Sequence, residues 1–257
     1  MFNLTNKIAL VTGAGSGIGA AIAETFARAG AHIYVTDFNE DTAEQTAQKI
    51  IKSGGAAEFL RLDVTKESDC ANVAKKVLGE RGRLDVLVNN AGVGCVGTLL
   101  QTSGEDMDRL YAVNVRGMFL MCKSFLPAML AAGHGHVINI ASVTGKRPLP
   151  RRTPYAASKM AVLGLTRTLA FEAGPRGVTV NSLSPGPVRG PRMRRMFDLD
   201  ALATGGTAEQ AQERFVSRAA LSRLVEEEEV AQAVIAMLSL TGLCGADVDL
   251  SAGMVAY

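Results

Sequence analysis

Short apolar runs alternate along the chain with longer stretches in which apolar residues recur at helical spacing. The apolar runs are expected to be strands, and they span residues 7–11, 32–37, 57–63, 84–88, 136–142, 178–184 and 247–250. The stretches 20–31, 39–54, 66–82, 105–132 and 154–173 are expected to be helices. Strands and helices that alternate at this interval predict a parallel sheet with right-handed crossovers. The pattern therefore indicates the α/β class.

The first expected strand ends in a glycine-rich turn, Thr12 to Gly19, that opens a helix. Glycines allow the backbone to turn tightly and to approach a pyrophosphate, and the helix start supplies free N–H groups and a partial positive charge. A glycine-rich turn alone is a weak signal. In the order strand, turn and helix it predicts a dinucleotide site.

Asp37 ends the second expected strand, twenty residues after Gly17. A carboxylate at this place can accept hydrogen bonds from both ribose hydroxyls of an adenosine, and it would repel a 2′-phosphate. Phe38 and Asn39 follow without a basic residue, so Asp37 favours NAD over NADP. The alternative is that Asp37 caps the next helix.

Polar or small residues also follow the third and fourth expected strands. Asp63 and Val64 end the third strand, and Asn89, Asn90, Ala91 and Gly92 follow the fourth. The carboxyl ends of parallel strands meet at one edge of a sheet, where ligands bind. These residues are therefore expected to line one crevice.

Tyr155 and Lys159 are four residues apart in an expected helix, so both side chains stand on one face. Pro154 fits a first helical turn, and Thr153 is a plausible cap. The ammonium group favours the tyrosinate, and each unit of pKa lowering corresponds to about 1.36 kcal/mol. Ser142, at the end of the preceding strand, could hold the same substrate oxygen. The three residues predict an acid/base site for alcohol–carbonyl interconversion, although Tyr-x-x-x-Lys spacing alone also occurs by chance.

Asn114 is an amide embedded among apolar residues of the 105–132 helix, where it must find partners or cost stability. It is either a satisfied core amide or a relay group.

The composition excludes several classes of function. The chain has 257 residues, 47% of them hydrophobic, which suits one compact domain over residues 1–257. A formal charge of +2 argues against a nucleic-acid or membrane-surface partner. No stretch is expected to cross a membrane. The four cysteines lack CxxC spacing and no secretory leader is visible, which predicts a cytoplasmic location. The histidines lack metal-ligand spacing, and His134 and His136 are expected in a turn before a strand, so no metal is predicted.

These motifs together resemble the short-chain dehydrogenase/reductase family. They are TGAGSGIG, Asp63-Val64, NNAG, Asn114, Ser142, Tyr155-Ala-Ala-Ser-Lys159 and Pro185-Gly186, and they occur in the family's order from Lys7 nearly to the C-terminus. The resemblance implies a single Rossmann-like domain with a seven-stranded parallel sheet between two helical layers, usually in a homotetramer or homodimer. Asp37 places the chain among the NAD-preferring members.

The resemblance also implies a role for each matching residue. Tyr155 is similar to the catalytic acid/base, Lys159 to the residue that lowers its pKa and holds the nicotinamide ribose, Ser142 to the clamp on the substrate oxygen, and Asn114 to the holder of a relay water. The implied cofactor residues are Gly13, Ser16, Gly17, Ile18, Asp37, Phe38, Asp63, Val64, Asn90, Ala91, Gly92, Tyr155, Lys159, Pro185, Gly186 and Val188. The family often has a threonine two residues after the valine, where this chain has Gly190.

Arginines are concentrated in the expected substrate segment, about 188–225. Arg189, Arg192, Arg194 and Arg195 lie within seven residues, and the loop before Tyr155 adds Arg147, Arg151 and Arg152. Arginine pairs with carboxylate, sulfonate or phosphate at two points. We expect a small anionic hydroxy or keto substrate held by Ser142, Arg152, Arg192 and Arg195. The alternative is a solvated face, or pairing between subunits with the acidic run 226–229.

The function expected is an NAD(H)-dependent oxidoreductase that interconverts a secondary alcohol and a ketone. One alternative is a reductase of 3-oxoacyl-[acyl-carrier-protein], which would prefer NADPH. Another, of a different class, is a non-catalytic NAD-binding regulator, against which the intact set Ser142, Tyr155 and Lys159 argues.

Overall fold

The computed structural model describes residues 3–147 and 149–254. Within them, seven strands form one parallel sheet in the order β3-β2-β1-β4-β5-β6-β7. The strands are β1 (Ile8–Thr12), β2 (His32–Asp37), β3 (Ala56–Arg61), β4 (Val86–Asn89), β5 (Gly135–Ile140), β6 (Val178–Pro185) and β7 (Asp247–Leu250). The α/β class and the seven-stranded parallel sheet predicted from the sequence are confirmed. The order reverses between β1 and β4, where open parallel sheets leave a crevice.

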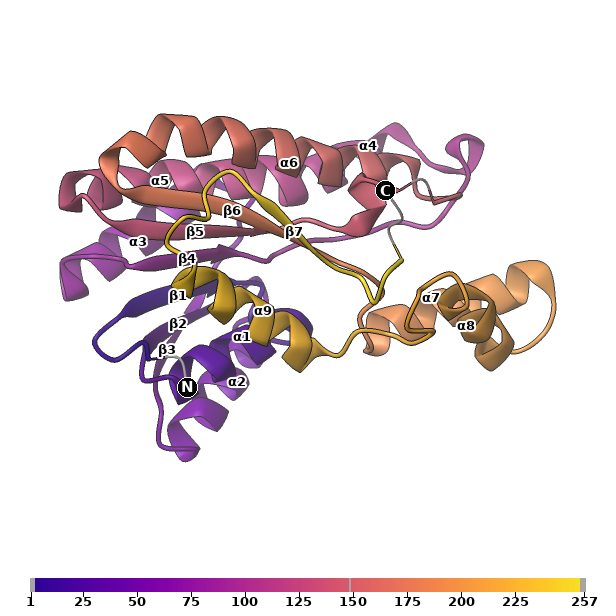
Figure 1. Cartoon of the computed structure of the whole chain (residues 1–257), viewed down its shortest axis with the longest axis horizontal. Coiled ribbons are helices and arrows are strands. Elements are labelled where there is room, and N and C mark those ends of the chain that lie inside the picture. Colours follow the sequence, from indigo (N-terminus) through magenta and orange to yellow (C-terminus); the bar gives the residue numbers. More distant parts are fainter. Residues whose placement is uncertain (1–2, 148, 255–257) are drawn as a thin grey trace.

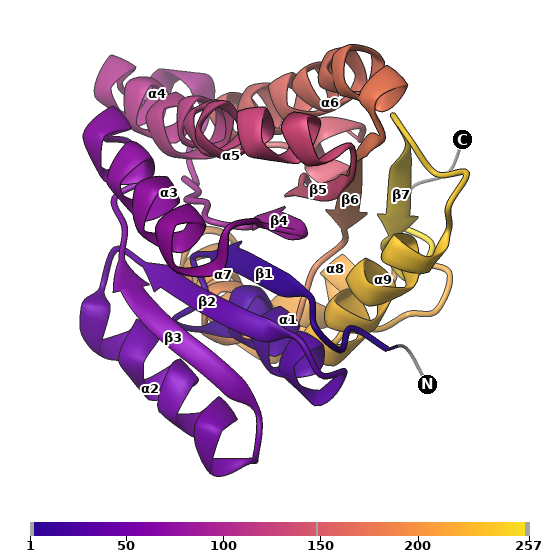
Figure 2. The same ribbon diagram turned by 90° about the vertical axis from the view of Figure 1, so that its left-hand side faces the viewer.

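Helices cover both faces of the sheet (Figures 1 and 2). One face carries α1 (Gly17–Arg28), α2 (Glu40–Lys52) and α9 (Glu227–Ser239). The other carries α3 (Glu67–Arg81), α4 (Gly104–Tyr111), α5 (Met118–Ala132) and α6 (Thr153–Ala173). Each layer buries apolar side chains against the sheet, and β1, β4 and β5 contribute to both cores. The predicted three-layer Rossmann-like arrangement is therefore confirmed.

The helix expected at 105–132 is one continuous helical run, but it is not regular throughout. A π-helical turn, Ala112–Gly117, joins α4 to α5 and contains Asn114. By length and composition this run, Gly104–Ala132, could cross a membrane, contrary to the expectation that no stretch could. It packs against α3 and the sheet as a core helix of the fold, and core helices pass the same test.

The apolar pattern did not predict α9 or the two helices that precede it after β6. These two helices are α7 (Pro191–Thr204) and α8 (Ala208–Val216), and they project beyond the carboxyl ends of the strands (Figure 1). Phe197, Ala211 and Leu224 form a small separate core beneath them. The two helices therefore extend the wall of the crevice above the sheet.

Two local predictions around the catalytic motifs are wrong. β5 ends at Ile140, and Ser142 lies beyond it, where its hydroxyl caps a single 3-10 turn (Val143–Gly145) by accepting from the Thr144 N–H. Thr153 is the first residue of α6 and not its cap; Arg152 holds the cap position and makes no side-chain capping bond. Pro154 fits the first turn as predicted.

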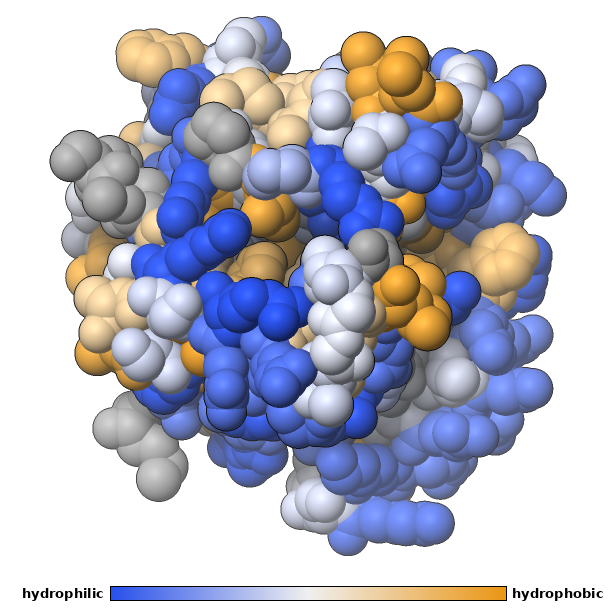
Figure 3. Space-filling model, turned by 90° about the vertical axis from the view of Figure 1, so that its right-hand side faces the viewer, coloured by the Kyte–Doolittle hydropathy of each residue, from blue (hydrophilic) through white to orange (hydrophobic). Residues whose placement is uncertain are grey.

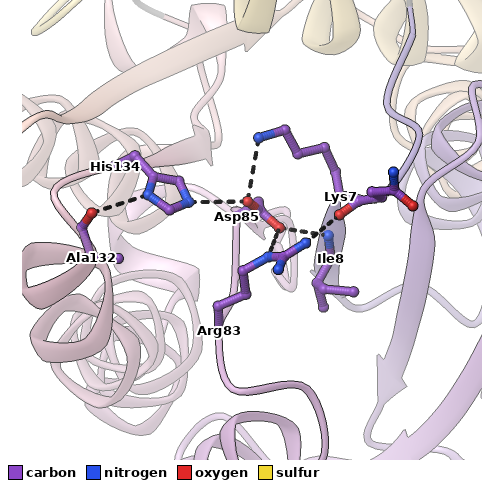
Figure 4. A network of polar contacts seen from close by, with 7 residues as sticks. Lys7, Ile8, Arg83, Asp85, Ala132 and His134 are labelled. Carbon is purple, nitrogen blue, oxygen red and sulfur yellow. Dashed lines mark hydrogen bonds and ion pairs between the residues drawn. The ribbon is translucent and has the colours of Figure 1, made fainter.

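One polar network links the amino ends of three strands, at the end of the sheet opposite the crevice. Asp85, which precedes β4, accepts from the Ile8 N–H at 2.8 Å and the Arg83 Nε at 3.1 Å (Figure 4). Lys7 and His134 lie 3.4 and 3.2 Å from the other carboxylate oxygen. The network links β1, β4 and the start of β5.

Candidate active site

A cavity of about 1350 Å³ opens at the carboxyl ends of the strands. Seen from the end where α7 and α8 lie, the surface is hollowed there, with apolar side chains inside and hydrophilic ones around them (Figure 3). The volume exceeds that of a typical small-molecule pocket, so it can hold a dinucleotide together with a substrate. All predicted cofactor and substrate residues line it, and of the predicted catalytic residues only Asn114 does not.

Tyr155, Lys159 and Ser142 meet at the floor of this cavity. The Lys159 Nζ lies 5.9 Å from the centre of the Tyr155 ring, as expected for side chains one helical turn apart. Lys159 is buried and donates to the Ile140 carbonyl at 2.7 Å. Ser142, carried by the turn after β5, lies beside the Tyr155 phenol, and its hydroxyl lowers the pKa of that phenol. The structure thus brings together the hydroxyl, the phenol and the ammonium predicted from the sequence.

The pKa of Tyr155 lies below its ordinary value of 10. Burial alone would raise the pKa, but the positive charges of Lys159 and Arg192, the hydrogen bond from Ser142 and the charge of Arg152 outweigh burial. The pKa of Lys159 is also lowered, by burial and by Arg192, although Tyr155 opposes this. A phenol held in this way exchanges its proton closer to neutral pH than a free tyrosine does.

Asn114 is a satisfied interior amide. Its Oδ1 accepts from the Val93 N–H at 2.8 Å, and its Nδ2 donates to the Val93 carbonyl and the Ser158 hydroxyl, both at 3.0 Å. Ser158 in turn donates to the Tyr155 carbonyl at 2.8 Å. Asn114 therefore fastens the loop after β4 to the first turns of α6. These contacts fit the interpretation of Asn114 as a satisfied core amide. A role in a proton relay stays a prediction.

The glycine-rich turn after β1 is shaped for close backbone approach. Gly13 has a φ of +62°, and a Cβ there would lie 2.8 Å from the Ala91 Cα, so only glycine fits. Asn90 donates to the Thr12 and Gly13 carbonyls, each at 2.9 Å. Ser16, Gly17 and Ile18 form the cavity wall at the start of α1. The start of α1 carries no acidic residue in its first turn, which suits a pyrophosphate.

Asp37 lies at the edge of the cavity and is not a helix cap. Its carboxylate accepts from the Gly15 and Asn39 N–H groups, both at 3.0 Å, whereas Asn39 caps α2. On the neighbouring strand Arg61 pairs in register with Asp37. The Arg61 guanidinium lies 5.2 Å from the centre of the Phe38 ring and 3.7 Å from Asp69. The sequence did not reveal this basic residue, because Arg61 lies on another strand and not directly after Asp37 in the chain.

The remaining predicted cofactor residues surround the same space. The Asp63 carboxylate accepts from the Thr65 N–H and hydroxyl at 3.0 and 2.7 Å. These bonds, with Lys66 and Arg61, lower its pKa although burial opposes them. The others that line the cavity at the strand ends are Val64, Ala91, Gly92, Pro185, Gly186 and Val188.

Gly190 and Glu227 form a part of the wall that the sequence did not predict. Gly190 has a φ of +154°, so a threonine there would be strained. The Glu227 Oε1 lies 3.0 Å from where a Cβ on Gly190 would stand and 3.4 Å from the matching position on Gly17. Burial raises the pKa of Glu227, and Glu228, Glu226 and Glu24 raise it further.

The arginine-rich segment divides into two groups. Arg189 is ion-paired with Glu226 at 2.9 Å, and Arg194 pairs with Asp198 and Glu209 at 3.4 and 3.1 Å, so these two form part of a solvated face. Arg152, Arg192 and Arg195 line the cavity. Arg189 borders the cavity as well. The ion pairs support a solvated face for Arg189 and Arg194, and substrate binding by Arg152, Arg192 and Arg195 stays a prediction.

No cluster of His, Cys, Asp and Glu suited to a metal occurs in residues 3–147 and 149–254. His134 follows the Gly133 cap of α5 and precedes β5, as expected, whereas His136 lies within β5 and not in a turn before it.

Comparisons with known proteins agree with this geometry. The family model described as short chain dehydrogenase matches residues 7–200. The cyclopentanol dehydrogenase of Comamonas sp. is 34% identical over 239 residues, 93% of this chain and 92% of the relative. The 4-formylbenzenesulfonate dehydrogenase of Comamonas testosteroni is 36% identical over 253 residues, 96% of this chain and 98% of the relative. A structure of NAD⁺-bound xylitol dehydrogenase superposes with a TM-score of 0.93 at 27% identity, covering 97% of this chain and 99% of that one. The chain therefore belongs to the short-chain dehydrogenase family of oxidoreductases.

Proposed function

We propose that the protein is an NAD-dependent oxidoreductase that interconverts a secondary alcohol and a ketone on a small molecule. In the oxidising direction the substrate hydroxyl would give up its proton to Tyr155, and bound NAD⁺ would accept the hydride from the carbinol carbon, which would leave a ketone, NADH and a proton. The observation that carries the proposal is the partly buried Tyr155 phenol on the cavity floor, beside Ser142 and one helical turn from Lys159.

The chain's own groups have separable roles in this step. The Tyr155 oxygen accepts or returns the proton, and its lowered pKa makes that transfer efficient near neutrality. The Ser142 hydroxyl holds the substrate oxygen beside the phenol. The Lys159 ammonium keeps the tyrosinate accessible by charge attraction. Asn114 is a positioning residue, because it acts through Ser158 on the α6 turn that carries Tyr155.

The residues present fit a dinucleotide, which would supply the hydride acceptor. Gly13, Ser16, Gly17 and Ile18 would hold the pyrophosphate, Asp37 the adenosine ribose, Asp63 and Val64 the adenine, and Asn90 and Lys159 the nicotinamide ribose. Asp37 supports NAD as the cofactor, because its charge opposes a 2′-phosphate.

The printed name of one relative, 4-formylbenzenesulfonate dehydrogenase, describes a substrate with a permanent negative charge. It supports the expectation that the substrate of this chain is an anionic hydroxy or keto compound.

Replacement of Tyr155 by phenylalanine tests the assignment. We expect NAD-linked turnover to fall by about 10²–10⁴, because the proton acceptor is lost while the ring remains. Tyr111→Phe, outside the cavity lining, is the matched control and should keep full turnover. The screen should cover hydroxy acids, polyols, sugars and secondary alcohols by absorbance of NADH. Near-full turnover of the Tyr155 variant would refute the assignment.

The same screen separates the alternatives. A higher kcat/KM with NADPH than with NADH on a 3-oxoacyl thioester would favour the acyl-carrier-protein reductase. Tight NAD binding without turnover of any compound would favour the regulator.

We also propose that the chain works as a homotetramer or homodimer in the cytoplasm. Phe119 on α5, and Met160 and Phe171 on α6, are large apolar side chains that are 52%, 50% and 85% exposed, which supports an assembly surface. All four cysteines are free, which supports a reducing compartment. Sedimentation of the purified protein measures the assembly.

A further inference from the structure

Two arginines from different elements face the Tyr155 ring. Arg152 stands at the start of α6 and Arg192 in the first turn of α7. Their guanidinium carbons lie 5.7 and 5.6 Å from the centre of the ring. Together with Lys159 at 5.9 Å, they surround one phenol with three cationic groups. The two guanidinium groups thus border the ring that carries the phenol of the proposed reaction.

The two guanidinium groups also lie close to each other. A Cβ built on Gly94 would stand 2.5 Å from the Arg192 Nη2 and 3.5 Å from the Arg152 Nη1, so both groups border the same space above the Gly94 backbone. Like charges at this separation repel, and a bound anion between them removes the repulsion.

Neither arginine has a carboxylate partner among the residues that the structure describes, in contrast to Arg189 and Arg194. Arg152 donates to the Cys95 carbonyl at 3.1 Å and contacts the Met196 sulfur, both of which are neutral. Burial lowers the pKa of Arg152. A partly buried charge without a counter-ion is costly, and a ligand anion supplies the missing partner.

The neutral contacts also fix where Arg152 points. Its two terminal nitrogens are held by the loop after β4 and by α7, so its direction is set before a ligand binds. An anion that binds to a prearranged guanidinium loses little ordering entropy of the protein.

We propose that Arg152 and Arg192 form a two-point site for an anionic group of the substrate, a carboxylate or a sulfonate, a few bonds from the carbon that is oxidised or reduced at Tyr155. A guanidinium group can donate two parallel hydrogen bonds to two oxygens of either anion. The inference rests on the proposed function and names its substrate class as short hydroxy or oxo acids. Arg195 lines the same cavity without a contact to the Tyr155 ring, and it is not part of this pair.

The test compares matched substrates in the full-length enzyme. A short 3-hydroxy acid and its methyl ester are oxidised with NAD⁺, and the ratio of their kcat/KM values is measured. We expect the unmodified enzyme to favour the acid on the order of ten-fold or more, and Arg192→Gln and Arg152→Gln to bring that ratio close to one, mainly through KM. Arg192→Lys should restore part of the preference. Arg194→Gln, on the same helix with the same change of charge, should leave the ratio unchanged.

Direct binding provides a second measurement that does not require turnover. Oxalate and methanesulfonate, as small anions without a carbinol, are titrated into the enzyme with NAD⁺ by calorimetry. Arg192-dependent binding of oxalate assigns a carboxylate site, and stronger binding of methanesulfonate assigns a sulfonate site. Equal kcat/KM for acid and ester, or anion binding that survives both glutamine substitutions, would overturn the proposal.

These results separate the two proposals. If the enzyme oxidises neutral alcohols in a Tyr155-dependent manner but ignores acids, the anion site fails and the proposed function stands. If no compound turns over while Arg192-dependent oxalate binding persists, the anion site stands and the proposed function fails.

Discussion

The acidity of Tyr155 results from opposing effects on one side chain. The side chain is partly buried, which disfavours the charged phenolate and by itself raises the pKa. Lys159, then Arg192, the hydrogen bond from Ser142 and finally Arg152 act in the other direction and prevail. A substrate anion that neutralised either arginine, as proposed above, would weaken this effect. It would couple substrate binding to proton transfer through charge at a single residue.

Asp37 is the residue on which cofactor preference should depend. Asp37→Ser removes the charge that opposes a 2′-phosphate and leaves Arg61 on the neighbouring strand as a cation at the same edge. We expect the NADPH to NADH ratio of kcat/KM to rise on the order of ten-fold, which is about 1.4 kcal/mol. Steady-state rates with both reduced cofactors on one ketone measure it.

Asp41→Asn is the matched control, because Asp41 is exposed on the same segment and accepts no bond from the glycine-rich turn. The NADPH to NADH ratio of kcat/KM in Asp41→Asn should stay within about two-fold of the ratio in the unmodified enzyme. An unchanged ratio in Asp37→Ser would show that another part of the adenosine pocket sets the preference.

At the residue scale, the sequence predicted the site residues that belong to a motif. It did not predict those that come together only when strands pair. Ser142, Tyr155 and Lys159 follow from chemistry carried within one segment of sequence, and the structure brings them together. Arg61 could not be found in this way, because its place beside Asp37 depends on which strands pair and in which register. Glu227 reaches Gly17 from an element more than 200 residues further along the chain.

At the scale of elements, the turn that carries Ser142 is anchored by a buried ion cluster. Lys146 follows that turn, and its ammonium lies 2.7 Å from Asp247 and 3.4 Å from Asp249 on β7. Asp247 also accepts from the Ser182 and Ser184 hydroxyls of β6, both at 2.8 Å. The side chains of Lys146 and Asp247 are only 14% and 6% exposed. The cluster therefore ties the active-site turn to the edge of the sheet.

Lys146→Met should be strongly destabilising, because it leaves two carboxylates buried together without their ammonium. We expect a loss of about 3 kcal/mol in the free energy of unfolding, within the range for breaking a buried ion pair. The turnover number should fall as well, since the Ser142 turn loses its anchor. Urea unfolding and NAD-linked kinetics measure the two effects.

Lys146→Arg keeps the charge and should recover most of the stability. A loss below about 0.5 kcal/mol in Lys146→Met, typical of an ordinary surface site, would contradict an anchoring role for the cluster.

Other elements have features that hydrophobic periodicity does not predict. The helical pattern of 105–132 predicted the run but not its π-helical turn, because the wider turn follows from the contacts that Asn114 makes to Val93 and Ser158. The arginine-rich segment became α7, in which Arg192 and Arg195 are three apart on the cavity side while Arg194 faces acidic partners. Composition alone could not divide the arginines, since the division depends on how α7 lies against the strand ends.

At the scale of the whole molecule, the carboxyl ends and the amino ends of the strands have different roles. The carboxyl ends of the strands bear the cavity, whereas the Asp85 network lies at their amino ends (Figure 4). Asp85 is 3% exposed and joins segments that are up to 127 residues apart in sequence, from Lys7 to His134. Polar groups at the amino ends of the strands therefore stabilise the fold, and those at the carboxyl ends line the candidate active site.

Asp85→Asn tests this division through its dependence on pH. Burial would raise the pKa of Asp85, but the Ile8 N–H, Arg83 and Lys7 lower it below the ordinary value. A carboxylate with a lowered folded pKa contributes stability that is fully present above the unfolded value of about 3.9 and is lost as the pH falls through the folded pKa. We expect Asp85→Asn to cost about 1–3 kcal/mol at pH 7, since a charged hydrogen-bond acceptor is replaced by a neutral one.

Urea unfolding at pH 7, 4 and 3 should show a difference in the free energy of unfolding between Asp85→Asn and the unmodified protein that is nearly constant down to about pH 4 and narrows below it. The ratio of kcat/KM between substrates should not change, because the network lies at the far edge of the sheet from the cavity. Asp108→Asn, at an exposed helical position, should stay within about 0.5 kcal/mol at every pH. A stability difference that is independent of pH would mean that Asp85 acts through packing and hydrogen-bond geometry instead of charge.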